Sequence, residues 1–578
     1  MTELVTLPTS PGDMPAALAR LVGVLRAQPI VVVAEDLVVA SAAMSPLVDD
    51  DFAPTSMLVR PAPREGDVRV RHHQVVSVGT TFHEVSSPDQ VSVGVLRIAE
   101  ADREQAADAL SKLADCLVSG SVVSRGSDLV ELIAVALVRS QVRVQAVTMV
   151  DVPWFRAPDD RAAALVAIGK VSDERIARLQ ANRMDDGFYS TFVVRKLSKP
   201  LTRVALRLGM SPNSITLISF AVGLLAAASF ALGSTGALIV GAVLLQLSLI
   251  IDCVDGEVAR ATRKFSALGA WLDASTDRVK EFLAYAGLAV GAARLGIDIW
   301  WIAIVLVALQ TTRHMSDYDF SRVQRMREAY VPDRDIRERS DGVSGAAGGW
   351  SVGGAMEAST RLNRRDAVRW AKRAIHMPIG ERWLVISVMA AVAGAAWALG
   401  TLLVLGVIAF GYVIVGRTLR TLTWRGPTPP AGALLLGRQS DAGPVLSLLS
   451  RSQLERVWSL PWGWALPAAL RAIELGAVAV IALIWWPAAS VAAFWWMSVV
   501  AFHHYDVLYR TMQDASTPRW LVWGALGWDG RTILVVVLAL TGLLAAVLGW
   551  AAGALALLVV VIASIQWLLV QRKPRSPR

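Results

Sequence analysis

Residues 252–277 read DCVDGEVARATRKFSALGAWLDASTD and contain four aspartates, Asp252, Asp255, Asp273 and Asp277. The apolar runs 235–251 and 282–293 flank this stretch and are typical of membrane-spanning sequence. An ionised carboxylate at membrane depth is costly unless a positive charge compensates it, so such groups indicate function. We expect little compensating charge from the neighbouring sequence and therefore predict that the carboxylates hold divalent metal.

The composition divides the chain into a soluble part and a membrane part. The 578 residues are 54% hydrophobic and 18% charged, too apolar for a soluble protein of this size. Short β-rich runs alternate with helical ones in residues 1–150, which predicts a cytoplasmic three-layer α/β domain. The predicted strands are 29–40, 56–60, 68–78, 91–98 and 142–150, and the predicted helices are 101–117 and 129–140. Residues 1–22 lack a basic start followed by an apolar block, so we expect no signal peptide.

The remainder predicts a polytopic α-helical membrane protein with ten spans. The spans are 214–232, 235–257, 267–293, 298–314, 383–398 and 400–418, followed by 464–486, 489–503, 531–548 and 551–570. Basic residues cluster where the second, fourth and sixth spans end, for example at Arg260, Arg313 and Arg417. This pattern predicts a multi-pass protein of the cytoplasmic (inner) membrane, with both termini and the aspartates on the cytoplasmic side. It also accounts for the net charge of +9, and we expect no nucleic-acid partner.

The predicted domain boundaries follow these changes in composition. Residues 1–158 form the α/β domain, 159–210 a connector with a basic amphipathic helix at the membrane interface, and 211–425 a six-helix bundle. A basic cytoplasmic loop, 319–382, interrupts the bundle, and its segment 356–374 predicts a surface helix. A linker, 426–458, leads to a four-helix membrane domain, 459–578, for which we have no functional account. We interpret His503-His504-Tyr505-Asp506 in that domain as interfacial anchors and expect Arg471 to pair with Glu474.

The spacing of the aspartates predicts that they converge. Residues three or four apart share one face of a helix, and the two pairs lie on either side of a short basic turn. If the two helices pack antiparallel, the carboxylates meet just inside the cytoplasmic boundary. Oxygen ligands favour Mg²⁺ or Mn²⁺, and four carboxylates suffice for two ions and an anionic substrate. Gly256, Ala259 and Gly269 permit close approach of a ligand, and Arg260 can bind a phosphate, so the pattern suits a metal-bound diphosphate.

The run Asp252-x2-Asp255-Gly256-x2-Ala259-Arg260-x8-Gly269-x3-Asp273-x3-Asp277 resembles the signature of the CDP-alcohol phosphotransferases, with every fixed position matched. The resemblance implies a six-span membrane enzyme, usually a homodimer. Such an enzyme transfers a phospho-alcohol from a CDP-linked donor to a hydroxyl acceptor and releases CMP, as in phospholipid biosynthesis.

The resemblance also implies a role for each matched position. Asp252, Asp255 and Asp273 would be metal ligands, and Asp277 would be the base that activates the acceptor hydroxyl and a further metal ligand. The CDP pocket would be lined by Gly256, Ala259, Arg260 and Gly269, with Asn213 and Thr216 of the Pro212-Asn213-x2-Thr216 motif as further candidates. A phosphorylated acceptor is expected at basic helix ends, for which the candidates are Arg313, His314, Arg417 and Arg420. These four residues are equally compatible with anchoring the helix ends in the membrane.

The layout is similar to members of the family that carry a fused cytoplasmic nucleotidyltransferase-like domain, the inositol-phosphate cytidylyltransferase/di-inositol-phosphate phosphate synthases. Asp186-Gly187-Phe188-x-Ser190 and Ile379-Gly380-Glu381-Arg382 carry this likeness. The Gly-rich loop and lysine that would bind a triphosphate after the first strand are absent from residues 29–50, so we predict a catalytically degenerate domain. The donor stays open between CDP-diacylglycerol and a CDP-inositol-like compound. The alternative to an enzyme is a membrane scaffold or transporter built on a relict bundle.

Overall fold

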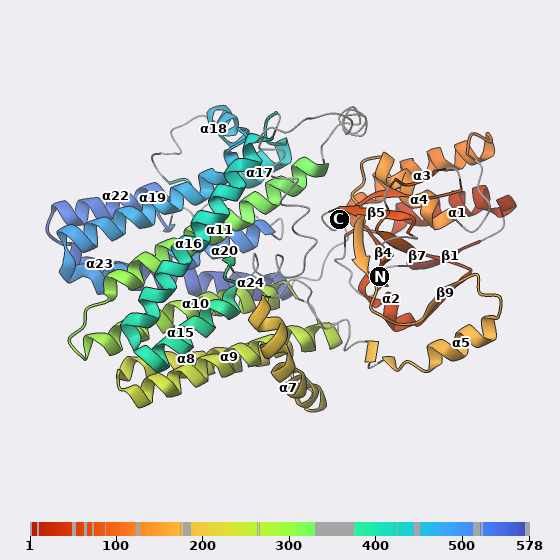
Figure 1. Cartoon of the computed structure of the whole chain (residues 1–578). Helices are drawn as coiled ribbons and strands as arrows, with labels where there is room; N and C mark the ends of the chain where they lie inside the picture. The colour runs from red at the N-terminus through yellow and green to blue at the C-terminus, as the bar shows by residue number, and fades with distance from the viewer. Residues whose placement is uncertain are drawn as a thin grey trace, which may run out of the picture. The chain divides into compact units, whose positions relative to one another are not determined.

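The computed structural model describes residues 3–572, apart from 9–10, 49–53, 63–65, 72–73, 82, 87, 123–127, 174, 177–186, 263, 265, 330–374, 425, 444, 446–450, 513–520 and 522–523. The chain forms two compact units (Figure 1). One consists of Met1–Arg183 with Ala259–Phe265, and the other of Met184–Val258 with Ser266–Arg578. The predicted surface helix 356–374 and Asp186 lie outside the described residues.

The amino-terminal unit is built on a seven-stranded sheet with the order β1-β2-β7-β4-β8-β6-β5. The strands are β1 (Glu3–Leu7), β2 (Ile30–Ala34), β4 (Ser56–Pro61), β5 (Val68–Arg71), β6 (Gln74–Val78), β7 (Gln90–Ile98) and β8 (Gln145–Thr148). A second, two-stranded sheet joins β3 (Leu37–Val39) and β9 (Trp154–Arg156). The helices of this unit are α1 (Met14–Ala27), α2 (Ser41–Val48), α3 (Arg103–Val118), α4 (Leu129–Arg139) and α5 (Arg161–Gly169).

The expected three-layer α/β arrangement is not confirmed, because the sheet curls back on itself. The predicted strand 68–78 is in fact two strands, β5 and β6, which pair antiparallel with each other. This hairpin carries β5 to β7, where Val68 pairs with Gln90, while Gln74 of β6 pairs with Gln145 of β8. Strands β7, β4, β8, β6 and β5 therefore form a closed ring of pairings that resembles a small barrel.

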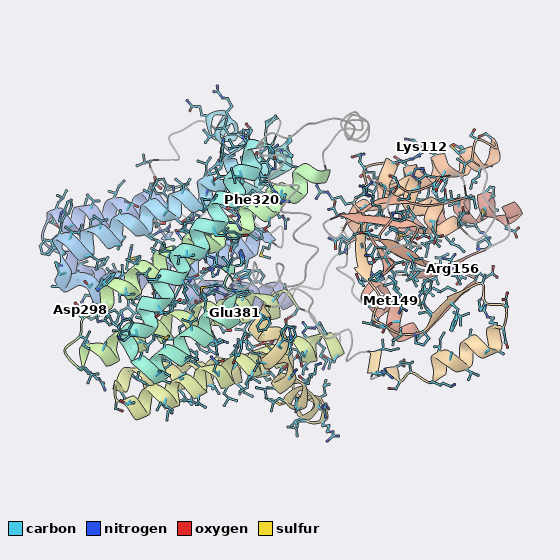
Figure 2. The ribbon with its side chains drawn as sticks, viewed as in Figure 1. Lys112, Met149, Arg156, Asp298, Phe320 and Glu381 are labelled. Carbon is cyan, nitrogen blue, oxygen red and sulfur yellow. The ribbon has the colours of Figure 1, made fainter. Side chains whose placement is uncertain are left out.

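A buried ionic cluster links the two sheets of this unit. Arg156 of β9 donates to Asp36 (2.9 Å) and to Glu131 of α4 (3.1 Å), and Ser92 also donates to Glu131 (2.5 Å). Arg156 is labelled in Figure 2. Gly94 of β7 has φ +89° and no side chain, which leaves room for this guanidinium. Burial raises the pKa of Glu131, although the charge of Arg156 opposes that shift.

The second unit begins with a basic amphipathic helix and six further helices. The amphipathic helix is α7 (Arg195–Arg207), preceded by the π-helical turn η3 (Ser190–Val194). The others are α8 (Pro212–Leu232), α9 (Thr235–Thr262), α10 (Ala267–Ala293), α11 (Trp300–Ala329), α15 (Ile379–Ala393) and α16 (Ala395–Leu422). Asp298, which accepts a hydrogen bond from the Trp300 amide, and Phe320 mark the course of α11 (Figure 2).

Small residues let α8 and α10 pack with their backbones in contact. A Cβ at Gly287 would lie 2.3 Å from the carbonyl oxygen of Ala227, and one at Gly291 would lie 2.2 Å from that of Phe230. Contacts of this kind are typical of helices that associate through small residues in membranes. The close pair brings the Thr216 and Ser219 side chains of α8 beside Asp255 and Asp252, and Gly223 beside Lys280.

Two of the predicted span boundaries are wrong, each at a glycine with positive φ. The predicted span 383–398 is divided at Gly394 (φ +95°), so that α15 ends at Ala393 and α16 begins at Ala395. The predicted span 531–548 is divided near Gly542 (φ +75°). Glycine adopts this left-handed backbone without the steric cost that other residues incur. It can therefore end a helix within a continuous apolar run, where hydropathy does not indicate the boundary.

The carboxyl-terminal region continues the same unit with further helices. They are α17 (Pro430–Arg438), α18 (Arg451–Trp458), η5 (Gly463–Ala465), α19 (Leu466–Val480), η6 (Ile481–Trp485), η7 (Pro487–Ala489), α20 (Ser490–Met512), α22 (Gly527–Leu540), α23 (Leu544–Ala556), η8 (Leu557–Val561) and α24 (Ile562–Arg572). Helices α19 and α20 pack against α11, and α20 and α24 pack against α10.

Among the described residues, five helical segments are long and apolar enough to cross a membrane. They are Pro212–Leu232, Thr235–Thr262, Ala395–Leu422, Gly463–Trp485 and Leu544–Leu569. The protein is therefore a helical, multi-pass membrane protein, whereas the predicted count of ten spans is not confirmed. Helices such as α15, with 15 residues, are short, and α10 and α11 carry many charged side chains.

Candidate functional site

Three of the four aspartates converge at the junction of α9 and α10. Asp252 and Asp255 lie on α9 and Asp273 lies on α10, and each offers a carboxylate oxygen within 4.8 Å of the others. The two helices are joined by a short turn, so residues near the end of α9 face residues near the start of α10. Three convergent carboxylates are a donor set that fits a hard divalent cation such as Mg²⁺ or Mn²⁺.

Hydroxyl groups from α8 hold two of these carboxylates in place. Thr216 donates a short hydrogen bond to Asp255, and Ser219 donates to Asp252 Oδ1 at 3.0 Å. Both hydroxyls are buried. Thr216, which the sequence suggested for the nucleotide pocket, thus contacts a candidate metal ligand directly. Ser219 was not predicted, although it lies one turn after Thr216 on the same helix.

A buried lysine compensates part of the negative charge, contrary to our expectation that the sequence supplies little. The Lys280 ammonium lies 2.6 Å from Asp252 Oδ1, 3.0 Å from Asp277 Oδ1 and 2.9 Å from Ser219 Oγ, and its side chain is fully buried. Gly223 of α8 makes room for it, because a Cβ there would lie 2.8 Å from the lysine Cγ and Cδ. Asp277 is held by this ion pair and lies outside the group of three convergent carboxylates.

The candidate nucleotide residues lie on the helix ends around the aspartates. Asn213 is next to Gly269, where a Cβ would lie 3.0 Å from the Asn213 Oδ1. The Ser266 hydroxyl accepts from the Gly269 amide and caps α10. Gly256 is on α9 between the aspartates and Ala259, so the spacing keeps it on their face of the helix. Ala259 and Arg260 continue α9 but group with the other compact unit.

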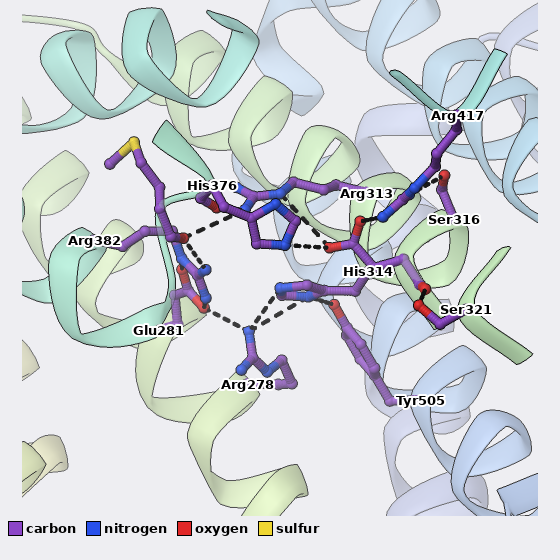
Figure 3. A network of polar contacts seen from close by, with 12 residues as sticks. Arg278, Glu281, Arg313, His314, Ser316, Ser321, His376, Arg382, Arg417 and Tyr505 are labelled. Carbon is purple, nitrogen blue, oxygen red and sulfur yellow. Dashed lines mark hydrogen bonds and ion pairs between the residues drawn. The ribbon is translucent and has the colours of Figure 1, made fainter. Parts of the chain in front are cut away.

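A second polar cluster lies one turn further along α10, and Figure 3 shows it at close range. Glu281 binds Arg382 through both carboxylate oxygens, at 2.8 and 3.0 Å, and also accepts from Arg278 at 2.9 Å. Arg417 donates to Ser316 at 2.8 Å and pairs with Asp317. We refer to these side chains, together with Arg313, His314 and His376, as the arginine cluster.

The arginine cluster combines four guanidinium groups with two carboxylates, and Arg313 Nε lies 3.8 Å from Asp317 Oδ2. Nε and Nη1 of the buried Arg313 make no hydrogen bond with any residue that the structure describes, and its Nη2 donates to the His376 carbonyl. Burial lowers the pKa of His376, and the charge of Arg313 assists this shift while that of Asp317 opposes it. An excess of buried positive charge with unused N–H groups is suited to bind an anion.

The predicted acceptor residues fall into two groups. Arg313, His314 and Arg417 belong to the arginine cluster. Arg420 lies one turn beyond Arg417 on α16, and its side chain makes no hydrogen bond or ion pair within the described part of the chain. Arg278, Glu281 and Arg382 were not predicted. The sequence did contain a signal, because Arg278 directly follows Asp277 in the aspartate motif. Arg382 also belonged to the quoted Ile379–Arg382 motif, but no role was assigned to it.

The cluster around His503 is buried and does not consist of interfacial anchors as expected. His503 bonds to Asp441 (3.1 Å) and His504 to Glu474 (2.7 Å), while Arg531 pairs with both carboxylates at 2.6 Å. Arg471 donates instead to carbonyl oxygens at 439 and 440, so its predicted pairing with Glu474 is wrong. Although burial opposes it, the charge of Arg531 holds the pKa of Asp441 well below its usual range.

Two families of proteins match separate parts of this chain. Residues 209–323 match the CDP-alcohol phosphatidyltransferase family, and residues 443–576 match a family of unknown function, DUF5941. The first match contains the four aspartates and all of α8, α9 and α10. The second contains the helices from α18 to α24.

Three curated relatives illustrate the similarity. The chain is 33% identical over 162 residues to a bifunctional IPC transferase and DIPP synthase of Rubrobacter xylanophilus, covering 28% of this chain and 36% of that protein. It is 35% identical over 99 residues to the archaetidylinositol phosphate synthase of Pyrococcus horikoshii, covering 17% and 51%. It is 32% identical over 129 residues to the phosphatidylinositol phosphate synthase of Mycolicibacterium smegmatis, covering 22% and 57%. The chain thus spans about a third to somewhat over half of these relatives.

Proposed function

We propose that the protein transfers a phospho-alcohol group from a CDP-linked donor to a hydroxyl acceptor, releasing CMP, as the match of residues 209–323 to the CDP-alcohol phosphatidyltransferase family suggests. The observation that carries this proposal is the convergence of Asp252, Asp255 and Asp273, whose carboxylate oxygens lie within 4.8 Å of one another. The names of the relatives, all of them synthases or transferases, agree with it.

Asp252, Asp255 and Asp273 would hold the divalent metal, which supplies charge neutralisation on the donor diphosphate. Thr216 and Ser219 orient two of these carboxylates. Asn213 and Gly269, with Gly256, Ala259 and Arg260, are proposed to contact the cytidine nucleotide. A second ion, expected from four carboxylates, would require Asp277, whose Oδ1 is ion-paired with Lys280 at 3.0 Å.

Asp277 is the proposed general base. The acceptor hydroxyl loses its proton to the Asp277 carboxylate as its oxygen forms a bond to the phosphorus next to the donor alcohol. The phosphorus–oxygen bond to CMP breaks, and CMP leaves with the electron pair. The Lys280 ammonium holds the Asp277 carboxylate in position through Oδ1 at 3.0 Å.

The arginine cluster is the proposed site for an anionic acceptor. Two of the relatives are named archaetidylinositol phosphate synthase and phosphatidylinositol phosphate synthase, which suggests inositol phosphate as the acceptor to test. The donor would then be CDP-diacylglycerol, whereas likeness to the bifunctional relative favours a CDP-inositol-like donor. We further propose a homodimer in the cytoplasmic membrane, with the site on the cytoplasmic side and a catalytically degenerate amino-terminal domain.

The test is CMP release by the purified full-length protein with Mg²⁺ or Mn²⁺. Labelled CDP-diacylglycerol and CDP-inositol are each combined with inositol phosphate, inositol and glycerol phosphate. We expect Asp277→Asn to lose at least a hundredfold in turnover and to remain folded, with an unfolding midpoint lowered by the loss of its ion pair with Lys280. Asp298→Asn, at the exposed start of α11, is the matched control and should retain full activity. Equal activity in Asp277→Asn would refute the assigned base, and no CMP from either donor would favour a scaffold or transporter.

A further inference from the structure

Helix α20 comes from the segment that matches a family of unknown function, yet it lies along the helices that carry the candidate site. Phe502, Tyr505, Asp506 and Tyr509 are spaced three and four residues apart, so they form one stripe on α20. Three of them are buried, and Tyr509 is partly buried. Their partners belong to α10, α11 and α24.

One end of the stripe binds the helix that bears Asp273. The Asp506 carboxylate accepts from the indole N–H of Trp271 at 3.1 Å and from that of Trp567 at 2.9 Å. The two indole rings stack with centroids 5.8 Å apart, and Phe502 contacts Trp271 edge-on. Trp271 lies between Gly269 and Asp273 in the aspartate motif, so α20 fixes the turn of α10 from which Asp273 projects.

The middle of the stripe contacts the arginine cluster. The Tyr505 hydroxyl and His314 Nδ1 are hydrogen bonded at 2.6 Å, and the Arg278 guanidinium lies over the Tyr505 ring at 5.9 Å. Figure 3 shows Tyr505 reaching His314 beside Arg278. Tyr509, one turn further, is within electrostatic range of Arg278, Asp273 and Asp277. Tyr505 and Tyr509 therefore lie near Arg278, the residue that directly follows the proposed base Asp277.

We propose that α20 supplies one wall of the acceptor side of the transferase site and that Tyr505 is a specificity-determining residue in that wall. This inference rests on the proposed function and assigns a role in it to the segment 443–576. Tyr505 fixes the His314 ring through its hydroxyl and supports Arg278 through its ring face, so both groups are held for an acceptor that carries hydroxyl and anionic groups.

The test is Tyr505→Phe in the full chain, which removes one hydroxyl and keeps the ring. A hydrogen bond of this kind contributes about 0.5–1.5 kcal/mol, so we expect the acceptor KM to rise about two- to tenfold. The donor KM and kcat should stay within about twofold of the unchanged protein. Tyr412→Phe is the matched control, because Tyr412 is exposed on α16, and it should leave all three constants unchanged.

A second variant, His314→Gln, tests the same contact from the other side. If the two residues act as a pair, the acceptor KM of the double variant should exceed that of the weaker-binding single variant by less than twofold. Additive effects, or an unchanged acceptor KM in Tyr505→Phe, would overturn the inference while CMP release persists. Absence of CMP release in the unchanged protein would instead overturn the proposed function, and this inference with it.

Discussion

Replacement of Lys280 by methionine removes the one buried ammonium that joins Asp252 to Asp277. At 2.6 and 3.0 Å, and with an effective dielectric constant of about 20, each pair has a Coulomb energy of roughly 6 kcal/mol before desolvation is subtracted. Breaking a buried pair by removing one partner costs about 3–5 kcal/mol, because the remaining charge stays buried. We therefore expect the thermal unfolding midpoint of Lys280→Met, measured without divalent metal, to fall well below that of the unchanged protein.

Divalent metal should reverse much of this loss. Methionine has nearly the same length as the lysine stem and keeps the packing against Gly223, so the variant differs chiefly in charge. With the ammonium gone, Asp252 and Asp277 are both free to bind a cation, and binding to the folded state stabilises it. The assay is a Mn²⁺ titration of the unfolding midpoint, with Mn²⁺ binding stoichiometry measured by electron paramagnetic resonance.

We expect the variant to gain more stability from Mn²⁺ than the unchanged protein gains, and to bind at least as many ions. A smaller or equal gain would refute the reasoning, because it would mean that the lysine does not compete with metal for these carboxylates. A variant that is as stable as the unchanged protein in the absence of metal would contradict the assigned ion pairs themselves.

Gly223→Ala should displace the buried lysine stem and lower the unfolding midpoint, whereas Gly476→Ala, at a position with open space, should not; the comparison of the two midpoints is the measurement. Arg382→Gln should leave Glu281 with one guanidinium in place of two and lower stability by about 3–5 kcal/mol, measurable as a lower midpoint. Burial raises the pKa of Glu131 above its ordinary 4.5. The folded amino-terminal unit therefore binds a proton at Glu131 more tightly than the unfolded chain does, and its stability falls as the pH rises from 4.5 through the pKa of Glu131 in the folded state. Glu131→Gln should remove this part of the pH dependence in unfolding scans, and an unchanged slope would contradict the assignment.

The aspartate junction could be predicted because its determinants are local. Asp252 and Asp255 lie one helical turn apart on α9, and Asp273 follows on α10 after the basic connection between the two helices. Helical spacing together with that connection is enough to bring the three residues together. The same reasoning could have found Lys280, which lies three residues after Asp277. Sequence alone does not show that Gly223, on another helix, leaves the space in which this lysine is buried.

The contacts of the carboxyl-terminal helices could not be predicted in this way. Trp271 and Asp506 are 235 residues apart, and a lone aspartate near the end of an apolar segment is equally compatible with a membrane interface. In the amino-terminal unit most strands were predicted from their β-rich runs. Their pairing was not, because the β5–β6 hairpin that closes the ring depends on which strand edges meet, and alternation of apolar residues does not encode that choice.

The polar contacts between the two family-matched segments argue that they form one functional unit. If residues 443–576 were only an appended anchor, its contacts with α10 and α11 would be apolar, since apolar packing is sufficient for helix association in a membrane. Instead Trp271 and His314 direct their polar atoms at Asp506 and Tyr505. Without those partners each polar group would be left buried and unsatisfied, or exposed to lipid, at a cost of about 1–3 kcal/mol apiece. A chain ending before residue 443 should therefore lose the order of the α10 turn that carries Asp273, and the proposed transferase domain should depend on the carboxyl-terminal helices for activity as well as for stability.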